Sequence, residues 1–462
     1  MKNQSKPNEL FDTSFEWSKN LQKAKQELAK ASSSYCLAKW AHSTIHFQLG
    51  ATHSCYNLPM HPIPLDGLDR NPSSLHNTPT KIEQREMMLN GQRPPHCAYC
   101  WTIEDLNTKN YSDRIIQSSG DWAYPSANEI YKSKLGETIS PRYLEVSFSN
   151  LCNFKCSYCS PVHSNLWAEE IKKYGDYPVS TKHLMPLQML DEESNPYIEA
   201  FKKWWPELRK DLKVFRITGG EPLLSKNTWQ ILEDIKNNPV PKIHLSINSN
   251  LGVSDQLIEK LISELKAIIV NKSVQKITIF TSIEATGEQA EYIRYGLRYN
   301  KFISNMEKIL SQLPEVRISI MSTFCALSIF SYLDLLKVVL DLKNKYSNNI
   351  TPQRVGISTN YLRYPEHLSA QVLNYSAVEY TNEIFNYMLE NKFILNKNEN
   401  GFTTQELSLF DNLQQWIKVD IGAEKKTFLQ NQFEKYFSEY DSRRGTNLTK
   451  TFPLLNNLLK GY

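Results

Sequence analysis

Long apolar segments are missing from this chain of 462 residues. A membrane-spanning helix needs about 18 or more consecutive apolar residues, and no stretch of the sequence approaches that length. The first six residues are polar and lack the apolar region of a secretory signal peptide. We therefore expect neither a transmembrane span nor a signal peptide, and no membrane partner.

The chain also has little excess charge of either sign. Its formal net charge is +4, and no long basic run stands out, so the charge pattern does not indicate a nucleic-acid partner. No internal repeat or low-complexity tract is evident. The hydrophobic fraction of 40% and the charged fraction of 22% are typical of a globular protein, and the length suffices for two or three domains.

Cysteine is sparse, but seven of the eight residues fall into two sets. Cys152, Cys156 and Cys159 have the spacing C-x3-C-x2-C and follow a predicted strand at 143–149. Four thiolates complete an ordinary iron–sulfur cluster or a structural zinc site. Three thiolates, with no histidine or fourth cysteine in the same loop, leave one metal position open to a small molecule. A zinc knuckle is the alternative, and an open cluster indicates a reducing cytoplasm rather than disulfides.

A second motif, Gly219-Gly220-Glu221-Pro222, directly follows a predicted strand at 213–218. Two glycines allow the backbone to approach a ligand closely, and a glutamate is a charge-matched acceptor for an ammonium group. The alternative interpretation of these four residues is an ordinary turn.

In this order, and each at the end of a strand, the two motifs resemble those of the radical S-adenosylmethionine (radical SAM) enzymes. Tyr158, the aromatic residue just before the last cysteine of the triplet, adds to the resemblance. The resemblance implies that Cys152, Cys156 and Cys159 hold a [4Fe–4S] cluster with SAM on its open iron. It also implies that the Gly-Gly-Glu-Pro motif receives the amino group of SAM.

The resemblance implies a radical mechanism as well. One electron from the reduced cluster would cleave SAM into methionine and a 5′-deoxyadenosyl radical, which removes hydrogen from an unactivated C–H bond of the substrate. The protein would contribute position and the exclusion of water. A flavodoxin or a ferredoxin is the implied kind of electron donor.

Strand and helix patterns alternate from about residue 143 to 365. This alternation predicts an α/β fold with a parallel sheet, whose ligand site lies at the carboxyl ends of the strands. Six units suit the partial (β/α)6 barrel that the resemblance implies. The predicted strands are 143–149, 213–218, 243–248, 276–282, 315–323 and 353–358, and the predicted helices include 196–211, 226–237, 254–268, 287–311 and 331–346.

Four further residues match family positions near the cofactor. Asn250 lies in a segment like the Thr-Asn-Gly turn of the family, although it suits a tight turn regardless. Ser282 and Glu284 lie in a segment like the Ser-Ile-Asp-Gly motif, where glutamate replaces the usual aspartate. Arg294 matches an arginine that often faces the carboxylate of SAM, and the alternative is a solvated arginine on a helix.

The other four cysteines, Cys36, Cys55, Cys97 and Cys100, precede the triplet. A predicted strand or hairpin separates the first two, and their C-x13-G-x4-C spacing resembles the start of the twitch and SPASM domains. That resemblance implies an auxiliary [4Fe–4S] cluster suited to electron transfer. Those domains usually follow the core, whereas this set precedes it, and a zinc site is the alternative. We expect the nearby His46 to be a hydrogen-bonded histidine of the hairpin rather than a ligand.

Several other residues have two interpretations. One interpretation places three tryptophans, Trp167, Trp204 and Trp205, along a substrate channel. The other, which we favour, is that they pack a helix on the sheet. Cys325 is expected to be a small buried residue rather than a ligand or a catalytic thiol. The cysteine-free residues 369–462 are predicted to be helical and to pack against the core, with substrate or partner docking as the alternative.

The predicted organisation is an N-terminal helical segment (1–35), a twitch-like module (36–110), a radical SAM core (140–368) and a C-terminal extension (369–462). A peptide is one candidate substrate, although no winged-helix recognition domain is evident at the start of the chain. A sugar or aminocyclitol-like metabolite is the other. The alternative from a different class is a zinc or iron–sulfur structural protein without catalysis.

Overall fold

The computed structural model describes residues 13–106, 111–132, 139–181, 189–351 and 353–459. Parts of the predicted N-terminal segment (1–12), of the twitch-like module (107–110) and of the C-terminal extension (460–462) lie outside the described residues. The chain forms two compact units: unit 1 comprises 1–149, 187–247 and 267–276, and unit 2 comprises 150–186, 248–266 and 277–462.

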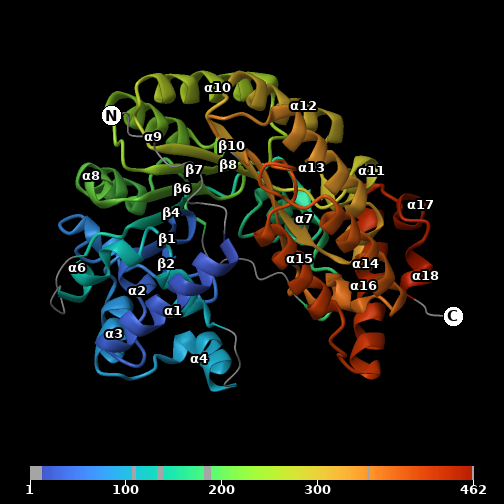
Figure 1. The fold of residues 1–462 in the computed structure, drawn as a ribbon, viewed down its shortest axis with the longest axis horizontal. Coiled ribbons are helices and arrows are strands. Elements are labelled where there is room, and N and C mark those ends of the chain that lie inside the picture. The colour runs from blue at the N-terminus through green and yellow to red at the C-terminus, as the bar shows by residue number, and fades with distance from the viewer. Residues whose placement is uncertain (1–12, 107–110, 133–138, 182–188, 352, 460–462) are drawn as a thin grey trace. The chain divides into compact units, whose positions relative to one another are not determined.

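Unit 1 is built on a mixed sheet (Figure 1). Strands β1, β4, β6 and β7 pair in parallel in that order, and β2 and β3 extend the β1 edge as antiparallel strands. The hairpin that the sequence predicts between Cys36 and Cys55 therefore lies in the same sheet as the first core strands. The bounds are β1 (His42–His46), β2 (Ala51–His53), β3 (His61–Pro62), β4 (Tyr143–Ser147), β6 (Val214–Thr218) and β7 (His244–Asn248).

One face of this sheet is apolar because every second residue of its strands is. In register, Val146 lies beside Ile217, and Leu144 lies beside Phe215. Helix α8 (Pro196–Asp211) covers this face, with the rings of Trp205 and Phe215 4.8 Å apart. Trp205 is buried in this packing, as is Trp204, which agrees with the packing interpretation of these tryptophans.

Short helices around the N-terminal cysteines complete the first part of unit 1. Helix α1 lies within the predicted N-terminal helical segment (1–35). The bounds are α1 (Thr13–Ala31), α2 (Ala38–Ala41), η1 (Phe47–Leu49), η2 (Pro72–Leu75), α3 (Pro79–Leu89), η3 (Pro95–Cys97), α4 (Ala98–Asp105), α5 (Asp113–Ser118), η4 (Tyr124–Ser126) and α6 (Ala127–Lys132).

Unit 2 contains the remaining strands. β8, β10 and β11 pair in parallel in that order, and a separate two-stranded ribbon joins β5 to β9 in antiparallel fashion. All six predicted core strands are therefore present, three in each unit, and each set lies in chain order. The bounds are β5 (Lys155–Cys156), β8 (Lys276–Thr281), β9 (Arg294–Tyr295), β10 (Val316–Phe324) and β11 (Val355–Tyr361).

The helices that follow β4 in the sequence agree with most of the predicted ranges. α8 and α9 have the predicted bounds, and α10 and α13 differ from theirs by at most two residues. The bounds are α7 (Asn165–Tyr174), η5 (Pro222–Leu224), α9 (Lys226–Asn237), α10 (Asp255–Val270), α11 (Gly287–Ile293), α12 (Tyr299–Gln312), η6 (Ala326–Phe330), α13 (Tyr332–Tyr346), η7 (Glu366–Leu368) and η8 (Ala370–Val372).

The prediction of one helix over 287–311 is wrong. The segment forms α11 and α12, and strand β9 lies between them. Backbone pairing with β5 takes Arg294 and Tyr295 out of the helical pattern. Gly296 follows with a φ of +107°, and a Cβ there would lie 2.7 Å from the Asn153 oxygen, so only glycine fits this close approach.

Residues beyond 369 are helical, as predicted, and form part of unit 2 (Figure 1). Helix α15 packs on β11, and the ring of its Phe410 stacks on Tyr332 with centroids 5.9 Å apart. None of the described helices is long and apolar enough to cross a membrane. The bounds are α14 (Ser376–Glu390), α15 (Thr404–Ile417), α16 (Ala423–Arg444), α17 (Leu448–Thr451) and α18 (Leu455–Leu459).

Candidate metal centres

The cysteine triplet lies in a loop of unit 2 that hydrogen bonds hold in place. The Cys152 N–H donates to Asn165 Oδ1 at 2.9 Å, and the Cys159 N–H donates to the Cys156 oxygen at 3.0 Å. Cys156 is buried, whereas Cys152 and Cys159 are partly exposed. The sequence therefore places three thiols on one short, internally bonded loop.

Strand pairing brings a cation to the central cysteine of this loop. Cys156 of β5 lies opposite Arg294 of β9, and Arg294 Nη1 lies 3.6 Å from the Cys156 sulfur. Burial raises the pKa of the Cys156 thiol, and Arg294 acts in the opposite direction. Burial also raises the pKa of Cys159, to about 12. A guanidinium at this distance fits a thiolate better than a thiol.

Arg294 is itself fixed by a buried carboxylate. Its Nε and Nη2 donate to Glu284 at 2.7 and 2.5 Å, and the Tyr158 hydroxyl donates to the same carboxylate at 2.7 Å. Burial lowers the pKa of Arg294, but Glu284 and Tyr158 outweigh it and raise the pKa above its ordinary value. The alternative interpretation of Arg294, a solvated arginine on a helix, is wrong, because the residue is buried on strand β9.

The predicted turn around Asn250 braces the first cysteine of the triplet. Asn250 Nδ2 donates to Asn153 Oδ1 at 2.8 Å and lies 3.9 Å from the Cys152 sulfur. Asn153 Nδ2 in turn donates to the Gly252 oxygen at 2.9 Å. Ser282 lies half-buried, one residue after β8 ends.

The Gly-Gly-Glu-Pro motif lies in unit 1, directly after β6. Gly219 has a φ of +132°, and a Cβ there would lie 2.7 Å from the Ser149 oxygen. The Gly220 N–H donates to that same oxygen at 3.1 Å. Glu221 is buried and accepts from the Leu223 N–H at 3.1 Å, which caps the short helix that begins at Pro222. The motif is thus a tightly packed turn with a buried carboxylate.

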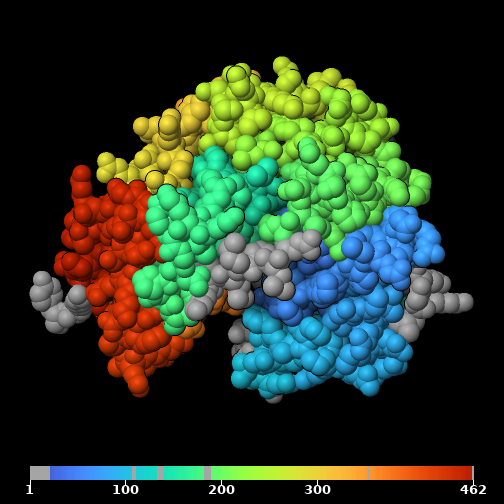
Figure 2. Space-filling view, turned by 180° about the vertical axis from the view of Figure 1, so that it is seen from behind, coloured from blue at the N-terminus to red at the C-terminus, as the bar shows by residue number. Residues whose placement is uncertain are grey.

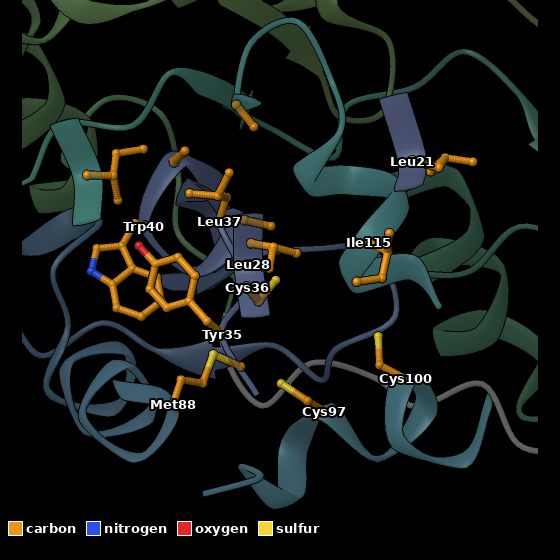
Figure 3. Close-up of a cluster of buried hydrophobic side chains, with 14 of the residues drawn as sticks. Leu21, Leu28, Tyr35, Cys36, Leu37, Trp40, Met88, Cys97, Cys100 and Ile115 are labelled. Carbon is orange, nitrogen blue, oxygen red and sulfur yellow. The ribbon is translucent and has the colours of Figure 1, made fainter. Parts of the chain in front are cut away.

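The four N-terminal cysteines converge, although they come from different elements of unit 1. Cys36, Cys55, Cys97 and Cys100 line one pocket. Figure 3 shows Cys36, Cys97 and Cys100 within one cluster of buried side chains. Burial raises the pKa of all four thiols, to about 11 in Cys36 and about 12 in Cys100.

The buried cations of unit 1 include Lys39, which lines this pocket together with Asp113 and Arg114. Lys39, Lys81 and Arg85 are at most 4% exposed, and none of them forms an ion pair with an acid among the described residues. Lys81 Nζ donates only to neutral groups, including Ser43 and Thr52 at 3.1 Å each. Lys39 lines the pocket itself, its ammonium group donates to Gln84 Oε1, and its charge lowers the pKa of Cys97 against the effect of burial.

Buried positive charge is costly unless an anion offsets it. Burial, followed by Arg85 and Lys39, holds the pKa of Lys81 well below its ordinary value. Deprotonated cysteines would offset the positive charge of Lys39, which lines the same pocket. In the metal-free arrangement, no group of three or more His, Cys, Asp or Glu residues within the described ranges is spaced to hold a metal ion.

His46 is a buried residue of the hairpin. Its Nε2 lies 3.1 Å from Nε2 of His53, and the two rings are stacked. The prediction of a hydrogen-bonded histidine rather than a ligand agrees with this contact. Cys325, the eighth cysteine, is buried in unit 2 and its sulfur lies 3.4 Å from Ser328 Oγ, as expected of a small buried residue.

Comparison with known proteins decides the family. Residues 146–324 match the model of the Radical SAM superfamily. The match spans about two fifths of the chain and identifies a radical SAM domain over these residues. The predictions of this superfamily, of an enzyme and of an α/β fold are confirmed, and the superfamily implies a [4Fe–4S] cluster with SAM. The twitch or SPASM subgroup and the auxiliary cluster stay predictions.

The curated relatives match only part of this chain. A GTP 3′,8-cyclase of Staphylococcus epidermidis is 34% identical over 109 residues, which are 23% of this chain and 26% of the relative. A probable GTP 3′,8-cyclase of Methanocaldococcus jannaschii is 29% identical over 141 residues, 30% of this chain and 37% of the relative. The chain thus spans between a quarter and two fifths of the length of these relatives.

Solved structures show a distant likeness. SuiB of Streptococcus suis bound to S-adenosylmethionine is 12% identical, with a TM-score of 0.37, over 77% of this chain and 70% of SuiB. SuiB bound to its precursor peptide SuiA is 14% identical, with a TM-score of 0.35, over 77% of this chain and 70% of SuiB.

Two groups escaped the sequence analysis. The cations Lys39, Lys81 and Arg85 gave no pattern that sets them apart from surface residues. Tyr436 and Arg444 of α16, which bond the cysteine loop, lie about 280 residues from it along the chain. Pairing over such a separation leaves no signal in a single sequence.

Proposed function

We propose that this protein is a radical SAM enzyme whose cluster is held by Cys152, Cys156 and Cys159. The observation that carries the proposal is the loop of three thiols with the Arg294 guanidinium 3.6 Å from the central sulfur. When bound, the cluster supplies one electron to cleave SAM into a 5′-deoxyadenosyl radical, which removes hydrogen from an unactivated C–H bond.

The other predicted cofactor residues have distinct proposed roles. Arg294, held by Glu284 and Tyr158, stabilises the thiolate of Cys156 through a charge-assisted contact. The carboxylate of the buried Glu221 accepts hydrogen bonds from the ammonium group of SAM. The turn at Gly219 and Gly220 has no side chains, which lets the backbone approach SAM closely. Pro222 shapes that turn. Asn250 positions the loop beside Cys152, and Ser282 belongs to the same proposed cofactor site.

We also propose an auxiliary [4Fe–4S] cluster on Cys36, Cys55, Cys97 and Cys100. The four cysteines line one pocket together with the buried Lys39, whose ammonium group would offset part of the charge of four thiolates. Four protein ligands leave no iron open for substrate, so electron transfer is the proposed role. Zinc is the alternative occupant of the same four thiolates.

Metal analysis tests both assignments. Wild type, reconstituted anaerobically, is expected to hold about eight irons per chain, the content of two [4Fe–4S] clusters. Replacing Cys152, Cys156 and Cys159 together by alanine should leave about four, and so should replacing Cys36, Cys55, Cys97 and Cys100. Four irons together with one zinc in wild type would overturn the auxiliary cluster, and no iron in any form would overturn the whole proposal.

The proposed partners follow from this chemistry. A low-potential donor such as flavodoxin or ferredoxin would reduce the cluster, and the cytoplasm would keep the thiols free for metal. We propose a peptide or a sugar-like metabolite as the substrate. The name of the cyclase relatives is not carried over, because the match covers so small a share of them.

A further inference from the structure

Helix α16 of the C-terminal extension binds the backbone of the cysteine loop. The Tyr436 hydroxyl donates to the Ser157 oxygen, and Arg444 Nη1 donates to the Lys155 oxygen at 2.7 Å. A third donor, Trp167 Nε1 of α7, holds the Cys156 oxygen at 2.9 Å. The carbonyl groups of Lys155, Cys156 and Ser157 thus each accept a hydrogen bond from a side chain outside the loop.

The two donors of α16 are rigidly seated. Tyr436 is 0% exposed, and its ring stacks on Tyr177 with centroids 4.7 Å apart. The Arg444 guanidinium lies 3.8 Å from the centre of the Tyr440 ring and pairs with Glu170 at 3.0 Å. A buried, fully bonded guanidinium has few other positions available to it.

The buried carboxylate Glu170 connects the helix to the loop a second time. Both Arg444 and the Lys155 ammonium donate to it, as does the Tyr177 hydroxyl at 2.6 Å. Burial raises the pKa of Glu170, but these donors outweigh it and lower the pKa to about 2. The carboxylate is therefore ionised and holds both cations. Figure 2 shows α16 and residues 150–181 side by side on one face of unit 2.

Because a peptide group is planar, fixing its carbonyl also fixes the N–H of the next residue and the direction of both flanking side chains. Outer groups that orient metal ligands are known to change metal affinity and cluster potential. The bonds from α16 hold the peptide group that precedes Cys156 and the one that follows Ser157, and so restrain the backbone from which the Cys156 thiol projects.

We propose that Tyr436 and Arg444 are positioning residues that hold the cysteine loop in its cluster-binding arrangement. The C-terminal extension is then a structural part of the cluster site rather than a docking module for substrate. This inference rests on the proposed function, since it takes the triplet as the cluster ligands.

The test compares two conservative variants. Tyr436→Phe removes the hydroxyl that bonds Ser157. Tyr440→Phe, the matched control, removes an equally buried hydroxyl of the same helix, which donates to the Tyr292 oxygen at 2.6 Å outside the loop. Both are reconstituted as the full chain, and iron release to a chelator and the electron paramagnetic resonance spectrum of the reduced cluster are measured. Amide exchange of residues 157–159 is measured on the metal-free chain.

We expect Tyr436→Phe to release the triplet's iron about fivefold faster than wild type, the factor for the loss of one net hydrogen bond, with an altered spectrum. Its loop amides should exchange faster by a similar factor, while Tyr440→Phe matches wild type in all three readouts. Wild-type behaviour of Tyr436→Phe, or equal changes in both variants, would overturn the inference. A wild type that takes up no iron at the triplet would instead overturn the proposed function, and the exchange data would still report the hydrogen bond.

Discussion

Glu284 and Arg294 form a buried ion pair beside the cysteine triplet, with side chains 1% and 8% exposed. A buried pair is weak evidence of net stability, because desolvation offsets most of the attraction. Removing one partner is different, since the other is left buried and uncompensated. The pair therefore makes the position of Arg294 beside Cys156 sensitive to either residue.

We predict that Glu284→Gln lowers the free energy of unfolding by about 3–5 kcal/mol. The same substitution at Glu307, whose partner Lys345 is 61% exposed, should cost less than about 1 kcal/mol. Urea titration of both variants measures the difference. Equal losses in the two variants would show that Arg294 does not depend on Glu284.

The buried histidines give unit 1 a pH dependence. His76 is 0% exposed and contacts Lys81 at 3.4 Å and Arg85 at 3.0 Å. Burial, followed by these two cations, holds the pKa of His76 well below its ordinary value of 6.5. Unfolding therefore takes up a proton below pH 6.5, so the contribution of His76 is complete above that pH and is lost as the pH falls.

We predict that His76 removes about 1.4 kcal/mol of stability for each pH unit below 6.5. Between pH 7.5 and 5.5, the free energy of unfolding of His76→Gln should therefore fall by about 1.4 kcal/mol less than that of wild type. The slope is compared rather than the absolute value, because glutamine also changes the packing. Identical slopes in wild type and variant would contradict the shifted pKa.

At the scale of elements, the strands could be predicted because alternation and turn residues mark them locally. The helix over 287–311 was misassigned, because pairing of β9 with β5 is a contact between distant segments that helical periodicity does not reveal. The same contact places Arg294 beside Cys156. The residue was therefore found by resemblance, whereas its surroundings required the structure.

The turn after β6 offers a prediction at this scale. We expect Gly219→Ala to destabilise the protein by more than about 1 kcal/mol, because it adds a Cβ overlap with the Ser149 oxygen to an unfavourable φ of +132°. Gly175→Ala is the control, since its φ is +78° but nothing lies within 4 Å of the new Cβ. Thermal unfolding should show a larger loss for Gly219→Ala, and an equal loss would mean that the overlap relaxes freely.

At the scale of the whole molecule, both cysteine sets could be read from spacing. The spacing does not reveal which other residues surround the two sets and bond to them. The buried cations beside the N-terminal set and the bonds of α16 to the triplet both join segments that are distant in sequence. The predicted boundaries 1–35, 36–110, 140–368 and 369–462 stay predictions.

The central claim is that the cysteine triplet cleaves SAM, and the formation of 5′-deoxyadenosine tests it most directly. Anaerobically reconstituted protein is mixed with dithionite and SAM, and the product is quantified for wild type, Cys156→Ala and Cys325→Ala. Cys325, which is buried in unit 2 and belongs to neither set, is the matched control. We predict product from wild type and Cys325→Ala and none from Cys156→Ala. Equal product from Cys156→Ala, or none from an iron-loaded wild type, would contradict the account.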